Sequence, residues 1–399
     1  MRESRAACLI GPRQAGKSTL ARHLAEHGLD ANVISLDTPA RLAAALADPT
    51  GLIARIDRPT IIDEVQRAPE LMLAIKERLD RDQSRGQFLL TGSANILTLP
   101  SIRDALPGRV EYLRLWSLSQ AEIERTTPSL LESLFAGRFP EVGDAPVGRH
   151  QYVDRVTSGG FPDAYRRMPR SRAKFYESYI DSILGQDLAD IAVTRSVTDV
   201  ARLLRALAAR SAGLLNFHAM ATRLGIDDKT AKAYVEILEN LMLVRRHHAW
   251  HANLGKRQIT SPKAYITDSG LLAHLVGADS DRLIEDDSLA GPLFESFAVM
   301  ELVREIELLP FPASIYHYRD KEQREVDAII ERHNGTLVAI EIKSGATVRK
   351  SDFRSLAYLR DRLGDRFHAG VVLYTGEATL PFGERLAAVP LSALWTPGR

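Results

Sequence analysis

The order of apolar and polar residues divides the chain into three parts. Short, mainly apolar runs at residues 6–10, 60–64 and 87–95 predict buried strands of a parallel sheet. Between residues 197 and 245, apolar residues recur at the spacing of one helical face, which predicts three helices. From residue 291 the pattern predicts helix, strand, strand, helix and strand. The expected fold class is therefore α/β, with a parallel sheet first, a helical middle and a mixed α/β domain last.

The first predicted strand leads into residues 11–18, which have the spacing G-x-x-x-x-G-K-S and precede an apolar helical pattern. Glycines let the backbone N–H groups of such a loop point inward, and the helix start adds positive charge, so the segment suits a phosphate chain. Lys17 is placed to reach the β- and γ-phosphates of ATP, and Ser18 to ligate Mg²⁺. A glycine-containing turn before an ordinary helix is the alternative. The residues expected to bind the nucleotide are Gly11, Pro12, Arg13, Gln14, Ala15, Gly16, Lys17, Ser18 and Thr19.

Two adjacent carboxylates end the second predicted strand. Asp63 and Glu64 follow the run at residues 60–62, which begins after Pro59. Beside a phosphate-binding loop, Asp63 is expected to hold the Mg²⁺ shell and Glu64 to polarise the attacking water. Adjacent acids are also common at surface turns, but together with the loop they predict hydrolysis of ATP rather than binding alone.

Three further residues are candidates for the same site. The third strand ends in small polar residues, and Ser93, or less favourably Asn95, is expected to orient water near the γ-phosphate. An ordinary strand-to-loop turn is the alternative. Arg109 lies in a Pro-Gly turn before another strand, and is a candidate to stabilise transition-state charge in the same chain or from a neighbouring subunit. A solvated arginine is the competing interpretation.

The middle of the chain contains two basic features. Residues 119–168 predict a helical lid or linker that ends in the turn Gly159–Pro162, a rigid bend with a structural role. Residues 166–174 then carry five basic residues and no acid, so Arg170 and Arg172 are candidate contacts to nucleic-acid phosphates. A solvated linker face is the alternative.

Residues 217–224, a turn at 225–227 and residues 228–243 resemble a helix-turn-helix, and the following segment suits a wing. The candidate groove contacts on the second helix are Lys229, Thr230, Lys232 and Tyr234. Neighbouring acids dilute this positive charge, and winged helices also dock proteins, so both DNA binding and protein binding remain open.

The C-terminal part contains a pair of carboxylates. A turn at residues 334–335 folds two strands into a hairpin, which places Asp327 beside Glu341 if both lie on one face. Glu341 and Lys343 are two residues apart and share a face. Paired carboxylates favour a cation, so Mg²⁺ or Mn²⁺ is expected there, with Glu295 completing the ligands and Lys343 orienting or deprotonating water. A hairpin with exposed charges is the alternative.

Composition and charge limit the class of protein to which this chain can belong. The chain has 399 residues, which suggests two or three domains, and its net charge of +1 gives no global basic field. The single cysteine, Cys8, excludes an internal disulfide framework and fits a reducing compartment. No apolar run reaches about 18 residues and no signal-peptide pattern is present, so we expect a cytoplasmic protein without membrane association. The cluster His247, His248 and His251 lacks a carboxylate or cysteine at ligand spacing, which favours a polar strand over a metal site.

Several of these segments together resemble a known family. The sequences GPRQAGKST, PTIIDEVQ, FLLTGSAN, LPGRV, SGGFP and AYITDSG are similar to those of AAA+-like ATPases that join a P-loop module to a C-terminal region, the AAA_14 and DUF4143 families. The resemblance implies an ATPase with the roles given to Asp63 and Glu64, and a homo-oligomer that holds nucleotide between protomers. Asp327, Glu341 and Lys343 resemble the D…ExK pattern of the PD-(D/E)xK nuclease superfamily, which implies a restriction-endonuclease-like domain. Val326 stands where that pattern usually has proline.

These observations predict four segments: an AAA+-like P-loop domain at 1–118, a helical lid at 119–168, a helical region with a winged-helix-like module at 169–290, and a nuclease-like domain at 291–399. The leading hypothesis is an ATPase that couples nucleotide turnover to a metal-dependent nuclease-like module acting on or binding DNA. The alternative is a nucleotide-gated switch or scaffold whose inactive C-terminal domain docks a protein or nucleic acid. A third hypothesis is an ATPase that regulates transcription through the helix-turn-helix.

Overall fold

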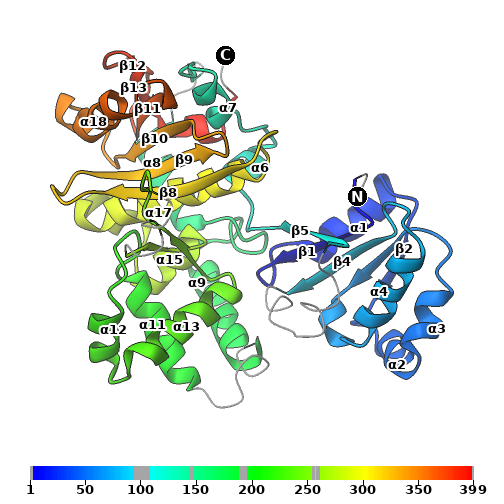
Figure 1. Ribbon diagram of the computed structural model, residues 1–399. Helices are drawn as coiled ribbons and strands as arrows, with labels where there is room; N and C mark the ends of the chain where they lie inside the picture. Colours follow the sequence, from blue (N-terminus) through cyan, green and yellow to red (C-terminus); the bar gives the residue numbers. More distant parts are fainter. Residues whose placement is uncertain are drawn as a thin grey trace. The chain divides into compact units, whose positions relative to one another are not determined.

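The computed structural model describes residues 3–93, 108–142, 147–187, 196–253, 257 and 261–397 (Figure 1). The chain divides into two compact units, each described by itself. The first holds Met1–Ser117, Ile180–Val197 and Glu236–Met242, and the second holds Leu118–Tyr179, Thr198–Val235 and Leu243–Arg399. Asn95, one of the predicted water-orienting residues, lies outside the described residues.

The first unit contains a five-stranded sheet of order β2-β3-β4-β1-β5 in which every neighbouring pair is parallel. Its strands are β1 (Ala6–Gly11), β2 (Asn32–Ser35), β3 (Thr60–Asp63), β4 (Phe88–Ser93) and β5 (Val110–Arg114). Its helices are α1 (Lys17–His27), α2 (Pro39–Ala47), α3 (Pro49–Ala54), η1 (Val65–Arg67) and α4 (Leu71–Arg81). The predicted parallel sheet is confirmed.

The central strands are continuous apolar runs because both of their faces are covered. Side chains alternate along β1, so Leu9 packs with Ala21 of α1 on one face, while Cys8 packs with Leu71 and Ile75 of α4 on the other. Cys8 is a free cysteine with no exposed surface, and burial raises the pKa of its thiol to about 12. The first unit therefore has a two-sided core built around β1.

Helices dominate the middle of the chain. They are α6 (Gln120–Glu124), α7 (Leu130–Phe135), α8 (Arg149–Ser158), α9 (Pro169–Ser182), η3 (Ile183–Asp187), α11 (Val197–Ala208), α12 (Phe217–Leu224), α13 (Asp228–Asn240), α15 (Ser269–Val276) and α16 (Ser280–Glu285). An antiparallel pair, β6 (Val244–His247) and β7 (Lys263–Ile266), follows α13. Gly225, with a φ of 71°, ends α12 in the left-handed conformation that glycine adopts readily. The predicted helical middle, with two strands after the helix-turn-helix, is present.

The C-terminal part is built on a six-stranded mixed sheet of order β12-β13-β11-β10-β9-β8. Its strands are β8 (Ala313–Arg319), β9 (Glu325–Arg332), β10 (Leu337–Ile342), β11 (Phe367–Tyr374), β12 (Leu380–Pro381) and β13 (Leu386–Pro390). Its helices are α17 (Asp287–Ile306), η4 (Lys350–Phe353), α18 (Arg354–Leu363), η5 (Gly364–Arg366) and η6 (Leu391–Leu394). Strands β9 and β10 are antiparallel, β10 and β11 are parallel, and the predicted mixed α/β fold is confirmed.

Two buried carboxylates of α17 cap the starts of other helices. Glu301 accepts a hydrogen bond from the backbone N–H of Gln120 in α6 (2.7 Å), and Glu305 accepts one from the backbone N–H of Leu131 in α7 (2.8 Å). The first N–H groups of a helix have no partner within it, so these acceptors stabilise both helix starts. Burial raises the pKa of Glu301 to about 7 and that of Glu305 to about 8.

We expect the second unit to lose stability as the pH rises from about 5 to about 8. Between the ordinary pKa of 4.5 and the raised value of about 8, Glu305 binds more protons in the folded state than in the unfolded state, so the free energy of unfolding falls with rising pH. Glu305→Gln keeps an acceptor for Leu131 but has no proton to lose. Its unfolding free energy, measured in urea across this pH range, should depend less on pH than that of the wild type by on the order of 1 kcal/mol or more. The exposed Glu307→Gln is the control, and equal slopes for all three proteins would contradict the expectation.

Candidate functional site

The glycine-containing loop follows β1, which lies between β4 and β5 in the parallel sheet. Gly16 has a φ of 98° and precedes α1, so the loop turns sharply at its end. A Cβ on Gly11 would lie 2.2 Å from the carbonyl oxygen of Leu115, which leaves room only for glycine. Lys17 is 5% exposed, and its Nζ donates hydrogen bonds to the carbonyl oxygens of Gly11 (3.0 Å) and Pro12 (2.8 Å). The loop is therefore wrapped around the ammonium group of Lys17.

The carboxyl ends of β3 and β4 bring three further groups to this loop. Ser18 Oγ donates a hydrogen bond to Asp63 Oδ1 at 2.9 Å, and the hydroxyl of Thr91 donates to the same oxygen. The backbone N–H of Glu64 donates to Thr91 Oγ1 (3.2 Å). Asp63 thus links the start of α1 to the neighbouring strand β4, and Thr91 holds it in place.

Glu64 occupies an unusual backbone conformation. Its φ is 59°, in the left-handed region that a non-glycine residue adopts at a cost. Its carboxylate accepts a hydrogen bond from Gln66 Nε2. The turn therefore directs Glu64 away from the strand direction of β3, and Gln66 fixes its side chain.

Thr91 was not predicted from the sequence. It lies within a run of buried residues, has no exposed surface, and contacts Asp63 through its hydroxyl. The signal that could have found it is a hydroxyl inside a strand that is otherwise apolar on both faces. The predicted Ser93 ends β4, where its Cα pairs with that of Gly11 in the loop.

Arg109 lies far from the loop within its own unit. It immediately precedes β5, whose first residue, Val110, pairs with Ala6 at the start of β1. The loop begins five residues later along β1, on the order of 16 Å away, which is farther than an arginine side chain reaches. Arg109 instead forms a two-pronged ion pair with Asp80 (2.6 and 3.1 Å), whose hydrogen bond lowers the pKa of that carboxyl. The same-chain role suggested for Arg109 therefore does not fit this arrangement, and a role across a subunit boundary stays a prediction.

The residues predicted to contact nucleic acid have different neighbours in the structure. Thr230 donates through Oγ1 to Asp227 Oδ2 (2.7 Å) and so serves the start of α13. Lys229 is exposed, and Lys232 lies over the ring of Phe217. Tyr234 is 5% exposed, so its suggested groove contact is wrong because the side chain belongs to the core.

In the basic run, Arg170 is exposed, whereas Arg172 is half-buried and donates to the carbonyl oxygen of Arg167 (2.8 Å). Its partial burial leaves Arg172 less available to a phosphate than Arg170 is. Nucleic-acid binding by either residue stays a prediction.

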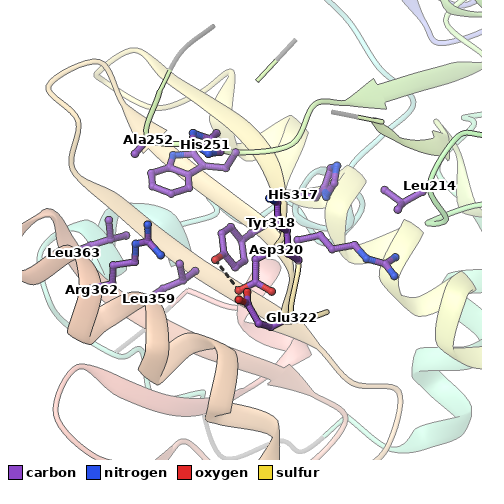
Figure 2. Close-up of a pocket in the computed structure, with 13 residues that line it drawn as sticks. Leu214, His251, Ala252, His317, Tyr318, Asp320, Glu322, Leu359, Arg362 and Leu363 are labelled. Carbon is purple, nitrogen blue, oxygen red and sulfur yellow. Dashed lines mark hydrogen bonds between the residues drawn. The ribbon is translucent and has the colours of Figure 1, made fainter. Parts of the chain in front are cut away.

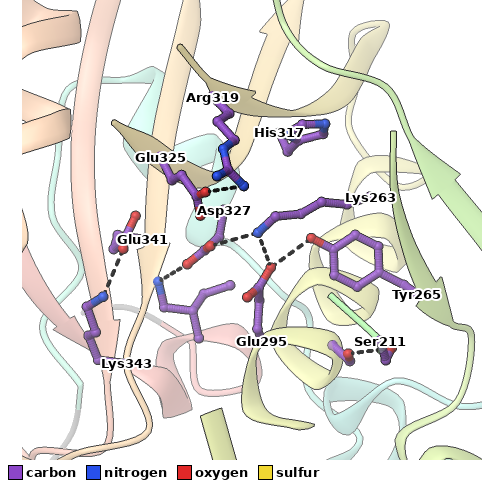
Figure 3. Close-up of polar contacts among 12 residues, drawn as sticks. Ser211, Lys263, Tyr265, Glu295, His317, Arg319, Glu325, Asp327, Glu341 and Lys343 are labelled. Atoms are coloured by element: carbon purple, nitrogen blue, oxygen red, sulfur yellow. Dashed lines mark hydrogen bonds and ion pairs between the residues drawn. The ribbon is translucent and has the colours of Figure 1, made fainter. Parts of the chain in front are cut away.

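A second cluster of charged residues lies in the C-terminal part (Figure 3). Ile340 of β10 and Ala328 of β9 are the last paired residues of the β9–β10 hairpin. Asp327 and Glu341 lie one residue beyond this pair, on the same two neighbouring strands. Lys343 Nζ donates to Glu341 Oε1 at 2.8 Å, and the backbone N–H of Ile342 donates to Asp327 Oδ2 at 2.9 Å. The two carboxylates therefore lie together, as the hairpin register predicted.

Two residues of β7 complete this cluster and were not predicted. Lys263 Nζ donates to Glu295 Oε1 (2.7 Å) and to Asp327 Oδ1 (3.2 Å), and the hydroxyl of Tyr265 donates to the same oxygen of Glu295 (2.9 Å). Lys263 and Tyr265 are two residues apart in a buried strand, so both side chains reach the same face. A lysine at the start of a buried, otherwise apolar strand is the signal that could have found them.

Burial and mutual repulsion set the charge of the cluster. Burial, with the charge of Asp327, raises the pKa of Glu295 to about 7 and that of Glu341 to about 8. Burial alone would lower the pKa of Lys263, but the negative charges of Asp327 and Glu295 outweigh it and raise that pKa. Lys263 is therefore a permanent cation between two acids.

This arrangement does not fit the predicted metal site. Within the described ranges, no group of three or more histidine, cysteine or acidic side chains is arranged to hold a metal ion. The ammonium of Lys263 lies between Glu295 and Asp327, two of the three predicted ligands, while Lys343 contacts the third, Glu341. Binding of Mg²⁺ or Mn²⁺ by these residues stays a prediction that requires Lys263 to move.

A cavity of about 670 Å³ lies in the same compact unit (Figure 2). It surrounds the end of the edge strand β8, whose residues alternate between the two sides. Figure 2 shows Tyr318 near Leu359 of α18, and His317 on the other side of β8 near Leu214. Among the residues that the structure describes, Trp250 Nε1 and His317 Nδ1 are buried and have no hydrogen-bond partner. The cavity is large enough for a small molecule or for a rearranged side chain.

Among the other histidines, His247 is buried and its Nε2 accepts a hydrogen bond from Arg245 Nε (3.2 Å). Burial holds the pKa of His247 well below its usual range. His251 accepts a hydrogen bond from the backbone of Asn253 (2.9 Å). These contacts give His247 and His251 structural roles.

Comparison with known proteins identifies three matching families. Residues 3–124 match the family described as AAA domain, and residues 149–282 and 290–394 match two domains of unknown function, DUF8612 and DUF4143. No helix in the described part of the chain is both long enough and apolar enough to cross a membrane.

Two curated relatives match nearly the whole chain. They are the uncharacterized proteins Rv2008c of Mycobacterium tuberculosis and Mb2031c of Mycobacterium bovis, each 30% identical over 393 residues, which is 98% of this chain and 81% of the relative. Among solved structures, a variant of RuvB from Thermotoga maritima is 19% identical, with 61% of this chain and 82% of that chain covered and a TM-score of 0.27. A score this low carries no argument about function.

Proposed function

Because the chain belongs to the family of the mycobacterial proteins Rv2008c and Mb2031c, and its first 120 or so residues match an AAA domain, we propose that it binds and hydrolyses ATP at the carboxyl edge of the parallel sheet. The observation that carries the proposal is the chain of contacts from Ser18 through Asp63 to Thr91, beside the loop wrapped around Lys17. The loop at residues 11–18, the acid pair Asp63 and Glu64, and the hydroxyl of Thr91 lie at the carboxyl ends of three neighbouring strands, β1, β3 and β4. Parallel sheets place ligand sites at this edge.

Each residue of this edge has a role in the proposal. Residues 11–19 hold the phosphates, and Lys17 turns from the loop carbonyls to the β- and γ-phosphate oxygens. Ser18 and Asp63 would hold Mg²⁺, which when bound neutralises charge on the phosphate oxygens. Glu64 accepts a proton from the attacking water, and Thr91 positions Asp63. Ser93 remains a candidate to orient that water.

We extend the proposal to the C-terminal module, whose state would change with nucleotide turnover. The ammonium of Lys263 between Glu295 and Asp327 favours a nucleotide-gated switch or scaffold that binds a protein or nucleic acid without cutting it. The adjacency of Asp327, Glu341 and Lys343 favours the second candidate, a metal-dependent nuclease acting on DNA. A homo-oligomer in which Arg109 serves a neighbouring subunit is part of the same proposal.

One set of assays tests both candidates. Purified chain should release phosphate from ATP in the presence of Mg²⁺, and the rate should be measured with and without duplex and single-stranded DNA. Cleavage of the same DNA should be followed with Mn²⁺ for the wild type, Lys343→Ala and the exposed control Lys350→Ala. Cleavage that only Lys343→Ala loses, with ATP hydrolysis unchanged, supports the nuclease. Absence of cleavage with any metal supports the switch, and absence of ATP binding and hydrolysis contradicts the whole proposal.

A further inference from the structure

Lys263 enters the acid cluster from a different part of the chain than the acids do. It lies on β7, 32 residues before Glu295 of α17 and 64 residues before Asp327 of β9. The three side chains are 7%, 17% and 11% exposed, and all belong to the second compact unit. The contact is therefore a buried bridge between β7 and two elements of the C-terminal domain (Figure 3).

A cation is required where this ammonium lies. Buried carboxylates without a compensating charge are strongly unfavourable, and Lys263 supplies that charge through two of its three donors. Carboxylate oxygens are also the ligands that Mg²⁺ and Mn²⁺ take in proteins. A divalent ion bound by Glu295 Oε1 and Asp327 Oδ1 would lie within about 3 Å of the ammonium, where like charges repel strongly. The two cations therefore exclude each other.

We propose that Lys263 is a tethered cation that occupies the divalent-cation position of the C-terminal acid cluster, so that Glu295 and Asp327 take up Mg²⁺ or Mn²⁺ only when Lys263 is withdrawn. The proposal rests on the second candidate function, in which these acids are metal ligands. The proposal adds a form of regulation that the metal-binding pattern alone does not contain. A residue of β7, outside the C-terminal domain, determines whether Glu295 and Asp327 can bind a metal ion.

Two residues of the cavity wall, Leu214 and His317, lie next to Lys263. The backbone of Lys263 pairs with that of Leu214, and Leu214 lines the cavity of about 670 Å³. His317, which lines the same cavity, also lies near Lys263 (Figure 3), and burial together with the charge of Lys263 lowers the pKa of its imidazole to about 4. A lysine has four flexible methylene groups, so rotation of its side chain can carry the ammonium out of the cluster without unfolding β7.

The test is binding of Mn²⁺ to the full chain, measured by titration calorimetry without nucleotide after treatment with a chelator. Lys263→Gln keeps a hydrogen-bond donor toward the acids but removes the charge, and Lys350→Gln is the exposed control. We expect Lys263→Gln to bind Mn²⁺ at least about tenfold more tightly than the wild type and the control. Adding Glu295→Gln to Lys263→Gln should abolish the gain. Equal affinity of Lys263→Gln and the wild type would overturn the proposal.

A second measurement tests the proposal even if Lys263→Gln folds poorly. Without Lys263 the acids lack a charge partner, so Mn²⁺ should raise the Tm of Lys263→Gln more than that of Lys350→Gln. The same rise in both variants, or none in either, would also overturn the proposal. Both readouts are independent of ATP, because all variants carry the same loop at residues 11–19. A failed proposal here is therefore distinguishable from a failed ATPase proposal.

Discussion

ATP hydrolysis should fall by about 10²–10³-fold when Lys17 is replaced by alanine, because in the proposed mechanism the γ-phosphate then loses the buried ammonium that would stabilise its developing charge. The same loss is expected for Glu64→Gln, which removes the group that we propose accepts the proton of the attacking water. The two variants should differ in binding: Lys17→Ala weakens nucleotide affinity, whereas Glu64→Gln retains it. Phosphate release gives kcat, and a fluorescent nucleotide analogue gives Kd.

The control for both variants is Arg81→Ala. Arg81 belongs to the same unit, but its side chain is 78% exposed, and its ion pair with Glu77 lies at the surface. Its kcat and Kd should match those of the wild type. Hydrolysis that survives in Lys17→Ala would remove the loop from the proposed mechanism.

The largest stability loss is expected at Asp268, which joins two of the segments that carry the family resemblance. Its side chain is 1% exposed and accepts hydrogen bonds from the backbone N–H groups of Gly160 (2.8 Å) and Leu271 (3.0 Å) and from the hydroxyl of Tyr176 (3.0 Å). Asp268→Ala removes the acceptor of the two buried backbone N–H groups, each at a cost of about 1–3 kcal/mol, while the hydroxyl of Tyr176 keeps its contact with the carbonyl oxygen of Ser158 (3.2 Å). The free energy of unfolding in urea should therefore fall by about 3–5 kcal/mol.

Two further variants calibrate this result. Asp268→Asn keeps one acceptor oxygen and should lose less than Asp268→Ala. Asp281→Ala, at an exposed position of α16, should change the free energy of unfolding by no more than about 1 kcal/mol. If Asp268→Ala cost no more than Asp281→Ala did, the hydrogen bonds of Asp268 would not be the support described.

The sequence alone was sufficient to predict those features that depend on residues close together in the chain. The parallel strands, the loop at residues 11–18 and the α12–α13 turn follow from local periodicity and from glycine at fixed positions. The adjacency of Asp327 and Glu341 followed from a two-strand hairpin, whose register is set by its own turn. Such features need no knowledge of the rest of the fold.

The site residues that we did not predict from the sequence are held in place by contacts between distant parts of the chain. Thr91 reaches Asp63 across 28 residues, and Lys263 reaches Asp327 across 64. In both cases a polar group sits in a buried strand, where periodicity alone marks the position as core. For Arg109, a turn that resembles a functional one lies at the opposite end of its sheet from the loop, so only the same-chain role does not fit.

The single cysteine of the chain provides a practical probe. Cys8 lies in β1, an inner strand of the first unit's sheet, has no exposed surface, and burial raises the pKa of its thiol to about 12. Since thiol reagents attack the accessible thiolate, they reach Cys8 only after β1 has separated from its covering helices. The rate of thiol labelling therefore reports the opening of the N-terminal sheet without an engineered tag. Slower labelling with added ATP would reveal nucleotide bound to the loop that ends β1.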